Sequence, residues 1–339
     1  MKDSEIIKIG VIGLGYWGPN LVRNFSTVPG SKVAMVCDLR EERLQIIKKS
    51  YPSIEITQNV DDIFNSPDID AVVIATPVFT HYELAKKALS LGKNVLLEKP
   101  MTDTVAHAED LIDLATKKGK LLMVDHTFLY NGAVKKMKEI VDKGDLGHLK
   151  YFDSTRINLG LIQQDVNVLW DLAPHDISIL NYLVSERPVS VQATGVSHIH
   201  NGIENIAYLT VNYSNGFIAH FNCSWSSPVK IRMMLLGGDK KMIVFNDLEQ
   251  AEKIKIYDSG FKVQNEEEKS FVRFAYRTGD IYVPKLDISE ALFNMASDFI
   301  NSIQTGSKPI SDWESGLWTI KILEAAQKSI KNKGVEVSL

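Results

Sequence analysis

The amino-acid sequence predicts an α/β protein: an N-terminal domain with a parallel sheet and a C-terminal α+β domain with a largely antiparallel, open sheet. The chain has 339 residues, which exceeds one small core, so two domains are expected. Short β-branched runs alternate with longer amphipathic runs as far as Asp125, and successive strand-like runs dominate the chain after it. The expected domains are therefore residues 1–125 and 126–339.

In the first half, β-branched runs are expected to be strands and amphipathic segments the helices between them. The strand candidates are Ile6–Ile12, Lys32–Cys37, Ala71–Ala75, Asn94–Leu97 and Leu121–Val124. The helix candidates are Pro19–Phe25, Glu41–Lys49, His81–Leu89 and Val105–Lys117. Ala71–Ala75 is apolar at every position, which is typical of a parallel strand covered on both faces.

In the second half, most strand candidates follow one another directly, as in an antiparallel sheet. They are Leu149–Asn158, Val189–His198, Asn205–Tyr213, Phe217–Trp225, Ile231–Leu236 and Lys241–Phe245. The helix candidates are Ala133–Val141, Pro174–Val184, Ile288–Ile303 and Trp313–Ser329. Several of these strands carry apolar residues on both faces, so a homodimer or homotetramer through this sheet is expected.

Composition narrows the possible partners. The net charge of -4 gives no field that would attract nucleic acid or a membrane surface, so a small-molecule partner is expected. The sequence shows no secretory signal and no apolar run long enough to span a bilayer, and a cytoplasmic location is expected. Cys37 and Cys223 lie in apolar runs and are expected to be buried, inert thiols. The charge run 265–269 is expected to be a solvated loop, and His198 and His200 to be surface or interface residues.

A glycine motif points to a cofactor. The sequence GLGYWG directly follows the first strand and opens the first helix, which is the context of a Rossmann dinucleotide-binding turn. Gly13 permits the turn, Gly15 lets the backbone approach a pyrophosphate, and Gly18 lets the helix pack on the strand. Asp38 ends the second strand, where its carboxylate binds ribose hydroxyls and repels a 2′-phosphate. NAD is therefore expected over NADP, although Arg40 is close enough to pair with that phosphate.

Three motifs together resemble the Gfo/Idh/MocA family of glucose-fructose oxidoreductase and inositol dehydrogenase. They are GLGYWG, the sequence ATPVFTH after the strand Ala71–Ala75, and EKP at residues 98–100. The resemblance covers essentially the whole chain and implies an NAD-dependent oxidoreductase. It also implies that Lys99 of EKP lies at the active site, before a proline whose peptide bond is often cis. Taken alone, a lysine at the end of a strand is usually a solvated surface charge.

A further family motif, Asp-x-x-x-His, matches Asp171 and His175 in WDLAPHD. The resemblance implies that Lys99, Asp171 and His175 are the catalytic residues, with either Lys99 or His175 accepting the hydroxyl proton. Pro174 is expected to begin the helix, which places Asp171 just before its first turn. A zinc site of His126, Asp171 and His175 lacks a compact ligand spacing, so no metal is expected.

Motif and resemblance together imply a set of cofactor-binding residues. These are Gly13, Gly15, Tyr16, Trp17, Gly18, Asp38, Arg40, Ala75, Thr76, Pro77, His81, Glu98 and Lys99. The substrate residues are expected from the polar and aromatic stretch leading into the Asp-x-x-x-His motif, from the segment after the last Rossmann strand, and from the catalytic residues. They are Lys99, Tyr130, Arg156, Asn158, Asn167, Trp170, Asp171 and His175. Many relatives have an arginine in the segment where this chain reads HTFLYN.

The run DVNVLWDLAPHDISIL resembles a branch of the family associated with sugar-nucleotide metabolism. The expected reaction is hydride transfer from a ring carbon of a nucleotide-linked sugar to nicotinamide, while a protein base removes the hydroxyl proton. Three alternatives remain open. They are an inositol or free-sugar dehydrogenase, an NAD-dependent glycosidase, and a non-catalytic dinucleotide-binding protein.

Overall fold

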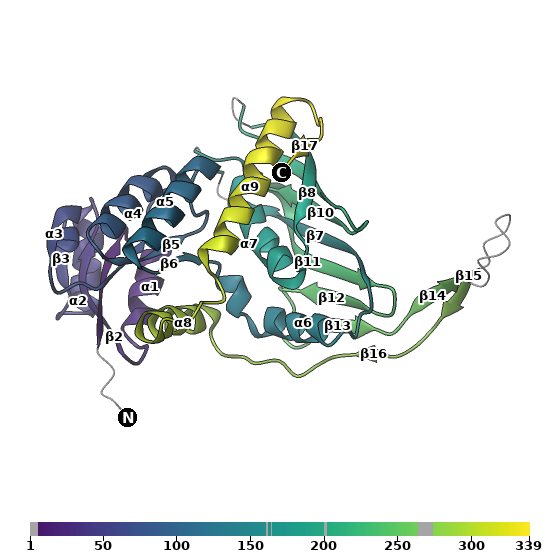
Figure 1. Ribbon diagram of the computed structural model, residues 1–339, viewed down its shortest axis with the longest axis horizontal. Coiled ribbons are helices and arrows are strands. Elements are labelled where there is room, and N and C mark those ends of the chain that lie inside the picture. Colours follow the sequence, from purple (N-terminus) through teal and green to yellow (C-terminus); the bar gives the residue numbers. More distant parts are fainter. Residues whose placement is uncertain (1–5, 161, 164, 200–201, 264–273) are drawn as a thin grey trace. The chain divides into compact units, whose positions relative to one another are not determined.

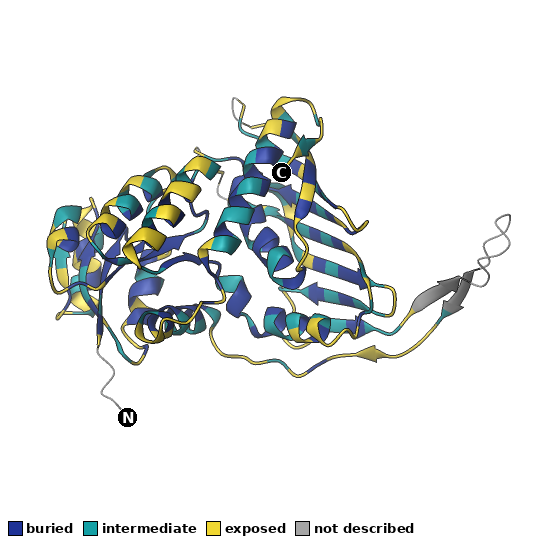
Figure 2. Cartoon of the chain, in the orientation of Figure 1, coloured by how far each residue is buried: buried dark blue, intermediate teal, exposed yellow. Residues whose placement is uncertain are grey.

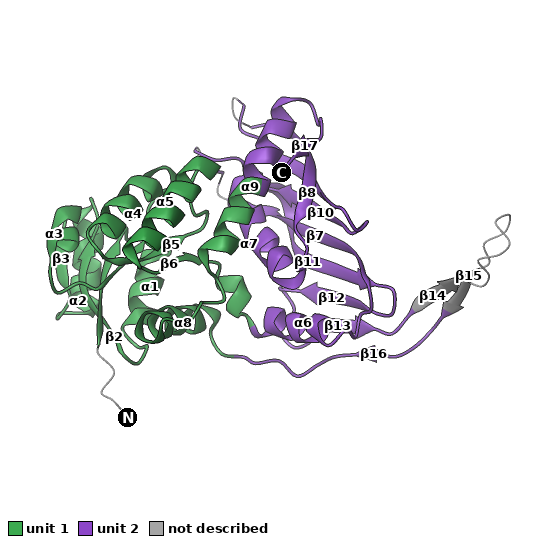
Figure 3. Cartoon of the chain, viewed as in Figure 1, with its two compact units in different colours: residues 1–131, 289–321 green, residues 132–288, 322–339 purple. Residues whose placement is uncertain are grey.

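The structure is a computed structural model that describes residues 6–160, 162–163, 165–199, 202–263 and 274–339 (Figure 1). His200 and the charge run 265–269 lie outside these described residues. The chain divides into two compact units (Figure 3). Unit 1 comprises Met1–Asn131 and Ser289–Lys321, and unit 2 comprises Gly132–Ile288 and Ile322–Leu339. The expected domains 1–125 and 126–339 differ from these units, since residues 289–321 group with the N-terminal part.

Unit 1 contains a six-stranded parallel sheet in the order β3-β2-β1-β4-β5-β6 among its described residues. The strands are β1 (Ile7–Ile12), β2 (Ser31–Cys37), β3 (Glu55–Thr57), β4 (Ala71–Ile74), β5 (Asn94–Glu98) and β6 (Leu122–Asp125). The helices are α1 (Gly18–Phe25), α2 (Glu41–Ser50), α3 (Val60–Asn65), α4 (His81–Ser90), α5 (Val105–Lys118) and α8 (Ala291–Thr305), with 3-10 turns η1 (Val78–Thr80) and η2 (Thr127–Tyr130). The predicted α/β fold with a parallel sheet is confirmed.

The sheet places three loops at one edge. All four residues of β4 are buried, because helices cover both faces of a parallel sheet of this kind. β1, β4 and β5 are neighbours and parallel, so the loops that follow them leave the same, carboxyl edge. The strand order reverses between β1 and β4, which is where open sheets of this type form a ligand crevice.

Unit 2 contains a nine-stranded sheet in the order β16-β13-β12-β11-β7-β10-β9-β8-β17 among its described residues. The strands are β7 (Leu149–Leu159), β8 (Pro188–Val196), β9 (Ile206–Tyr213), β10 (Ile218–Ser224), β11 (Ser226–Gly238), β12 (Met242–Asn246), β13 (Ile254–Tyr257), β16 (Ile281–Tyr282) and β17 (Val337–Ser338). Neighbours are antiparallel except for β7 and β10, which are parallel. The expected, largely antiparallel sheet is confirmed. β14 (Gly260–Val263) and β15 (Phe274–Arg277) pair separately.

Three helices complete unit 2 and its connection to unit 1: α6 (Gly132–Asp142), α7 (Val168–Leu183) and α9 (Trp313–Lys331), the last of which begins in unit 1. α7 packs on β7, β9 and β10, and burial alternates along these strands (Figure 2). Side chains such as Phe152 and Phe221 are buried on one face, whereas Tyr208, Ile218 and Met233 are exposed on the other. One face of the sheet therefore forms the core of unit 2, and the other is open in a single copy.

The expectation that a helix begins at Pro174 is wrong. The Asn167 side chain accepts hydrogen bonds from the backbone N–H groups of Leu169 and Trp170, both at 3.1 Å, so α7 begins six residues earlier. Pro174 lies in the helix interior, where it removes one backbone donor. Asp171 therefore lies in the first turn of α7 and His175 one turn later.

Two short elements of unit 1 were missed. β3 has three residues and α3 has six, which is too short for either to show a clear periodicity. A local signal for α3 does exist, because the Asn59 side chain accepts from the Asp61 N–H and caps the helix.

Candidate active site

A groove of about 920 Å³ lies at the carboxyl edge of the unit 1 sheet. Seven of the expected cofactor residues line it: Gly13, Gly15, Asp38, Arg40, Ala75, Thr76 and Pro77. Leu39, Arg43 and Phe79 also line the groove and were missed. For Leu39 and Phe79 the position in the sequence was a usable signal, since they lie in the segments that follow β2 and β4. Leu39 and Phe79 are both exposed, which suits apolar contact with a planar ring system.

The glycine turn has the geometry that a pyrophosphate needs. Gly13 has a φ of +93°, and a Cβ added there would lie 2.6 Å from the Ala75 carbonyl oxygen. A Cβ at Gly18 would overlap the Gly13 carbonyl, whereas one at Gly15 would meet nothing nearer than Arg43 Nη1 at 4.0 Å. Among the described residues, Trp17 is the N-cap of α1 and its side chain makes no capping hydrogen bond to the first turn. Open backbone therefore borders a helix N-terminus, and these residues fit a dinucleotide phosphate.

Asp38 is held rigidly at the end of β2. Its Oδ2 accepts from the Leu14 N–H at 2.7 Å and its Oδ1 accepts from the Arg40 N–H at 2.9 Å. Arg43 Nη1 lies 3.3 Å from Oδ2. The carboxylate thus connects the glycine turn to the following loop, and its remaining lone pairs suit ribose hydroxyl donors.

His81 connects the loops after β4 and β5 and is not among the residues that line the groove. Its ring is buried, with Nδ1 2.9 Å from the Pro100 carbonyl oxygen and Nε2 2.9 Å from that of Thr76. Burial lowers the pKa of His81, although its backbone hydrogen bonds oppose this. The Lys99–Pro100 peptide bond is cis, as the resemblance implied. His81 therefore joins the loop after β4, which lines the groove, to the loop after β5.

Lys99 follows β5 and is half-buried beside buried acids. Glu98 Oε2 accepts from the Lys99 backbone N–H at 2.9 Å. Burial, together with the nearby charge of Asp125, raises the pKa of Glu98 to about 8, and burial raises that of Asp125 to about 6. Burial and then the charge of Lys99 lower the pKa of His126 to about 3. Glu98, an expected cofactor contact, thus has its carboxylate in the interior.

In unit 2, Asp171 and His175 lie one turn apart on α7, and a tryptophan missed by the sequence reasoning contacts the first of them. The Trp225 indole Nε1–H donates to Asp171 Oδ2 at 3.0 Å. Trp225 is buried, and its backbone N–H donates to the Asn205 carbonyl at 2.9 Å. Gly160 lies against it, because a Cβ there would be 3.1 Å from the indole ring and 2.9 Å from Asn158 Nδ2. Asn158, Asp171 and Trp225 therefore belong to one region.

Four expected substrate residues have structural partners instead. Arg156 is 3% exposed, and its guanidinium binds the carboxylate of Asp176, which is 1% exposed. Tyr130 is buried, and its hydroxyl donates to Asp298 at 2.7 Å. Asn167 caps α7, and Trp170 is buried in that helix. The substrate roles expected of Arg156 and Tyr130 are not carried further, because neither polar group is accessible. The Asn167 side chain also donates from Nδ2 to Glu204 at 2.8 Å and to Gln327 at 2.6 Å.

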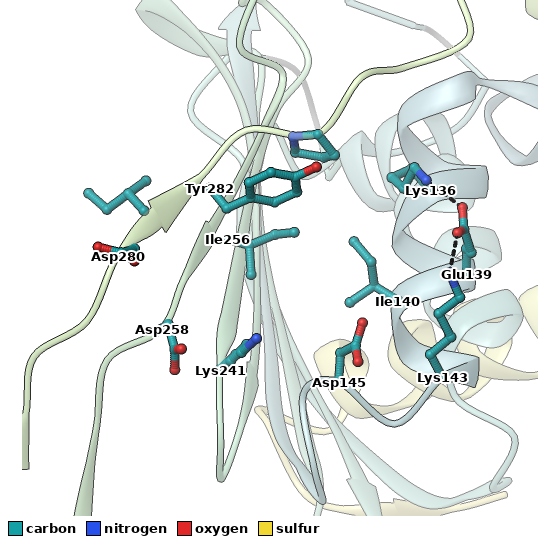
Figure 4. A pocket seen from close by; sticks show the side chains of 12 residues that line it. Lys136, Glu139, Ile140, Lys143, Asp145, Lys241, Ile256, Asp258, Asp280 and Tyr282 are labelled. Carbon is teal, nitrogen blue, oxygen red and sulfur yellow. Dashed lines mark hydrogen bonds and ion pairs between the residues drawn. The ribbon is translucent and has the colours of Figure 1, made fainter.

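A second hollow, of about 690 Å³, lies in unit 2 and is lined by side chains of both charges (Figure 4). Lys136 and Lys143 donate to Glu139 at 2.5 and 2.6 Å, and Asp258 pairs with Arg277. Two acidic side chains of its wall, those of Glu139 and Asp258, are thus already bound by cationic neighbours.

Among the described residues, no group of three or more His, Cys, Asp or Glu side chains is arranged to hold a metal ion. His126 belongs to unit 1, whereas Asp171 and His175 belong to unit 2. No described helix combines the length and apolarity needed to cross a membrane. Cys37 and Cys223 are buried free thiols, and burial raises the pKa of Cys37 to about 11.

Two family models match the chain. Residues 7–126 match the model described as the oxidoreductase family with an NAD-binding Rossmann fold, of the GFO/IDH/MocA group. Residues 134–244 match the GFO/IDH/MocA C-terminal domain. The two matches follow one another along the chain and together span most of it.

Two relatives are named as dehydrogenases of an inositol and of a nucleotide sugar. A myo-inositol 2-dehydrogenase of Thermotoga maritima is 23% identical over 341 residues, which cover 96% of this chain and 97% of that protein. A UDP-N-acetylglucosamine 3-dehydrogenase of Acidithiobacillus ferrooxidans is 27% identical over 225 residues, 64% of this chain and 67% of that protein. The solved structure of a UDP-N-acetylglucosamine 3-dehydrogenase from that organism has a TM-score of 0.82 at 22% identity, covering 96% and 98% of the two chains. This likeness shows a shared fold.

Proposed function

Because the chain belongs to the Gfo/Idh/MocA family of NAD(P)-dependent oxidoreductases, we propose that it transfers a hydride between nicotinamide and a ring hydroxyl of a nucleotide-linked sugar. The observation that carries the proposal is the groove at the carboxyl edge of unit 1, lined by the glycine turn and Asp38. The matched domain is an NAD-binding Rossmann fold, so the cofactor is NAD. The Asp38 carboxylate supports NAD over NADP, since a 2′-phosphate would meet a fixed negative charge.

The proposed cofactor contacts are the glycine turn and the groove beside it. Gly13 and Gly15 hold the pyrophosphate at the start of α1, where Gly18 lets the helix pack closely, and Asp38 binds the ribose hydroxyls. Tyr16 and Trp17 of the same turn lie beside the phosphates. When bound, NAD supplies the hydride acceptor. The residues of the chain bind it, orient it and exclude water from it.

The proposed catalytic residues are Lys99, Asp171 and His175. Lys99 polarises the substrate hydroxyl, and Lys99 or His175 takes its proton as the hydride leaves the carbon. Asp171 orients the substrate or the imidazole, and its own position is supported by the hydrogen bond from Trp225. Asn158 completes the proposed polar contacts to a hydroxyl-rich substrate.

The test is NADH formation by purified protein with NAD and a panel of nucleotide sugars, free sugars and inositols. Lys99→Ala and His175→Ala are expected to abolish turnover, and Lys118→Ala, an exposed lysine at the end of α5, serves as the matched control. If only inositols are turned over, the substrate is an inositol and not the proposed nucleotide-linked sugar. Hydrolysis of a glycoside without net formation of NADH would indicate an NAD-dependent glycosidase. Binding of NAD without turnover of any compound in the panel would indicate a non-catalytic dinucleotide-binding protein.

We further infer that two copies pair through the open face of the unit 2 sheet. Exposed apolar side chains on neighbouring strands support this, among them Tyr208, Ile218 and Met233. Met233→Glu is expected to lower the mass measured by sedimentation equilibrium to that of one chain. An unchanged mass would place the interface elsewhere.

A further inference from the structure

A proline lies inside α7, between the two proposed catalytic residues of this helix. Pro174 follows Asp171 by three residues and directly precedes His175. Proline has no backbone N–H, so residue 174 cannot donate to the carbonyl of Trp170, and its ring crowds that carbonyl. The hydrogen-bond ladder of α7 is therefore interrupted between Asp171 and His175, and the backbone alone fixes their relative placement less firmly than an unbroken helix would.

The part of α7 before Pro174 is held by side chains at its first turn. The Asn167 side chain caps the helix by accepting hydrogen bonds from two backbone N–H groups. The indole Nε1–H of Trp225 donates to Asp171 Oδ2 at 3.0 Å, and Trp225 is only 2% exposed. Because a buried ring in a close-packed core has little freedom to turn, this contact ties the first turn of α7 to the end of β10.

The part of α7 after Pro174 is held by a buried ion pair with β7. Asp176, which directly follows His175, is 1% exposed. Arg156 Nε lies 2.9 and 3.0 Å from its two carboxylate oxygens, and the Ser154 hydroxyl donates to its Oδ2 at 2.7 Å. Arg156 and Ser154 are alternate residues of β7, so both lie on the face of the sheet that packs against α7. Two neighbouring side chains of one strand therefore fix the Asp176 carboxylate.

The arrangement of this ion pair favours a role in orientation. Replacement of a buried ion pair by apolar side chains of similar volume is often neutral for stability, so stability alone does not require one. A planar guanidinium that binds both oxygens of a carboxylate holds it in one direction. Consecutive residues of a helix point about 100° apart, so a fixed Asp176 also fixes the direction of the neighbouring His175.

We propose that Arg156 is a positioning residue for His175, because through Asp176 it sets the rotation of α7 beyond Pro174. The contacts of the first turn set the part of the helix before the proline. Two anchors on the sheet thus do the work of the helix hydrogen bond that Pro174 removes. As far as catalysis is concerned, the inference rests on the proposed function, and Arg156 acts through Asp176 without touching the reacting atoms.

The first experiment observes the His175 ring by NMR without a substrate. The chain has eight histidines, and the signals of His175 in protein made with isotopically labelled histidine are identified by their loss in His175→Gln. The double variant Arg156→Met/Asp176→Leu is expected to broaden or split these signals, while those of His81 in unit 1 keep their positions. Pro174→Ala added to the double variant supplies the missing N–H and is expected to restore single, narrow His175 signals. Unchanged His175 signals in the double variant would overturn the proposal.

The second experiment separates positioning from stability in turnover. In the same double variant, kcat is expected to fall by up to roughly 100-fold, the effect of a misplacement of about 1 Å, while NAD affinity by fluorescence titration stays unchanged. Pro174→Ala is expected to recover most of this kcat in the double variant and to leave the kcat of the wild-type protein nearly unchanged. A kcat that falls only in proportion to the unfolded fraction, with no recovery by Pro174→Ala, would show that the ion pair is structural alone.

A second variant covers the case in which the double variant does not fold. Arg156→Lys keeps the buried charge but lacks the planar fork, so it should show the same loss and the same recovery. Arg232→Met is the matched control, because Arg232 lies in register beside Arg156 on β11 and pairs with Asp247. An equal loss of kcat in Arg232→Met and Arg156→Lys would contradict a specific role of the Asp176 anchor. The NMR measurement needs no substrate, so silence across the sugar panel would refute the proposed function while leaving the anchor of His175 standing.

Discussion

The buried ion pair of unit 2 provides the sharpest stability prediction. In the protein, Arg156 Nε lies 2.9 and 3.0 Å from the two carboxylate oxygens of Asp176. Arg156→Met removes this guanidinium and leaves the Ser154 hydroxyl, at 2.7 Å, as a donor to Asp176. Both partners are almost completely buried, so removal of one leaves an uncompensated charge, which costs about 3–5 kcal/mol. This is a large part of the roughly 5–15 kcal/mol that stabilises a typical protein. For a unit of this size, Tm should fall by roughly 6–20 °C.

Urea unfolding followed by circular dichroism measures this loss. The double variant Arg156→Met/Asp176→Leu is expected to recover most of it, because apolar side chains replace the whole pair. Arg232→Met is the matched control, since its partner Asp247 is partly exposed, and it should cost less than about 1 kcal/mol. A loss below about 1 kcal/mol in Arg156→Met, accompanied by a higher KM for substrate, would refute the structural role and restore the expected substrate role of Arg156.

Three further predictions concern the hydrogen bond of Trp225, the glycine turn and the buried His126. Trp225→Phe removes the indole donor to Asp171 and should lower kcat by roughly 10–100-fold, the value of a hydrogen bond to a charged group, while NAD affinity by fluorescence titration stays unchanged. A fall in NAD affinity instead would contradict this. Gly13→Ala should abolish NAD binding, because the added methyl group would occupy the tight turn against the Ala75 carbonyl. Gly216→Ala is the control: Gly216 also has a positive φ, but its added methyl group would meet no atom within 4 Å, so the variant should lose only about 1 kcal/mol of stability. Equal NAD affinities in the two variants would contradict a close approach of the cofactor to Gly13. His126 has a folded pKa of about 3, below its ordinary 6.5, so the unfolded chain binds a proton first and stability falls as pH drops from 6.5 towards 3. The unfolding free energy of His126→Gln should fall less steeply with pH over this range than that of the wild-type protein. Identical slopes for the two proteins would refute a lowered pKa of His126.

Much of unit 1 was predictable because its signals are local. The glycine turn depends on three residues next to one strand, and the motifs around Lys99 identified the family, which the two domain models confirm. The partners of Arg156 and Tyr130 were not predictable in this way. Asp176 and Asp298 lie on other elements, 20 and 168 residues away in the chain, and only the fold brings them into contact.

The start of α7 shows a second reason why the sequence did not predict the whole structure. Pro174 is a strong local signal for a helix start, yet the Asn167 cap, seven residues earlier, determines where the helix begins. The sequence contains both signals, and no pattern ranks them. The hydrogen bond from Trp225 to Asp171 had no signal at all, because the two residues are 54 positions apart and tryptophan is common in cores.

Unit 1 is made from two separated stretches of chain, and this affects how the protein can be synthesised and divided. α8 packs against α1, where the rings of Phe25 and Phe299 are 6.0 Å apart. A ribosome releases the N-terminal stretch long before Ser289–Lys321 exists, so that part of the core stays uncovered until this later segment has been synthesised. A cloning boundary placed at residue 125 would leave the same surface of α1 bare. A fragment that carries the cofactor groove in soluble form therefore needs the late segment joined back to it.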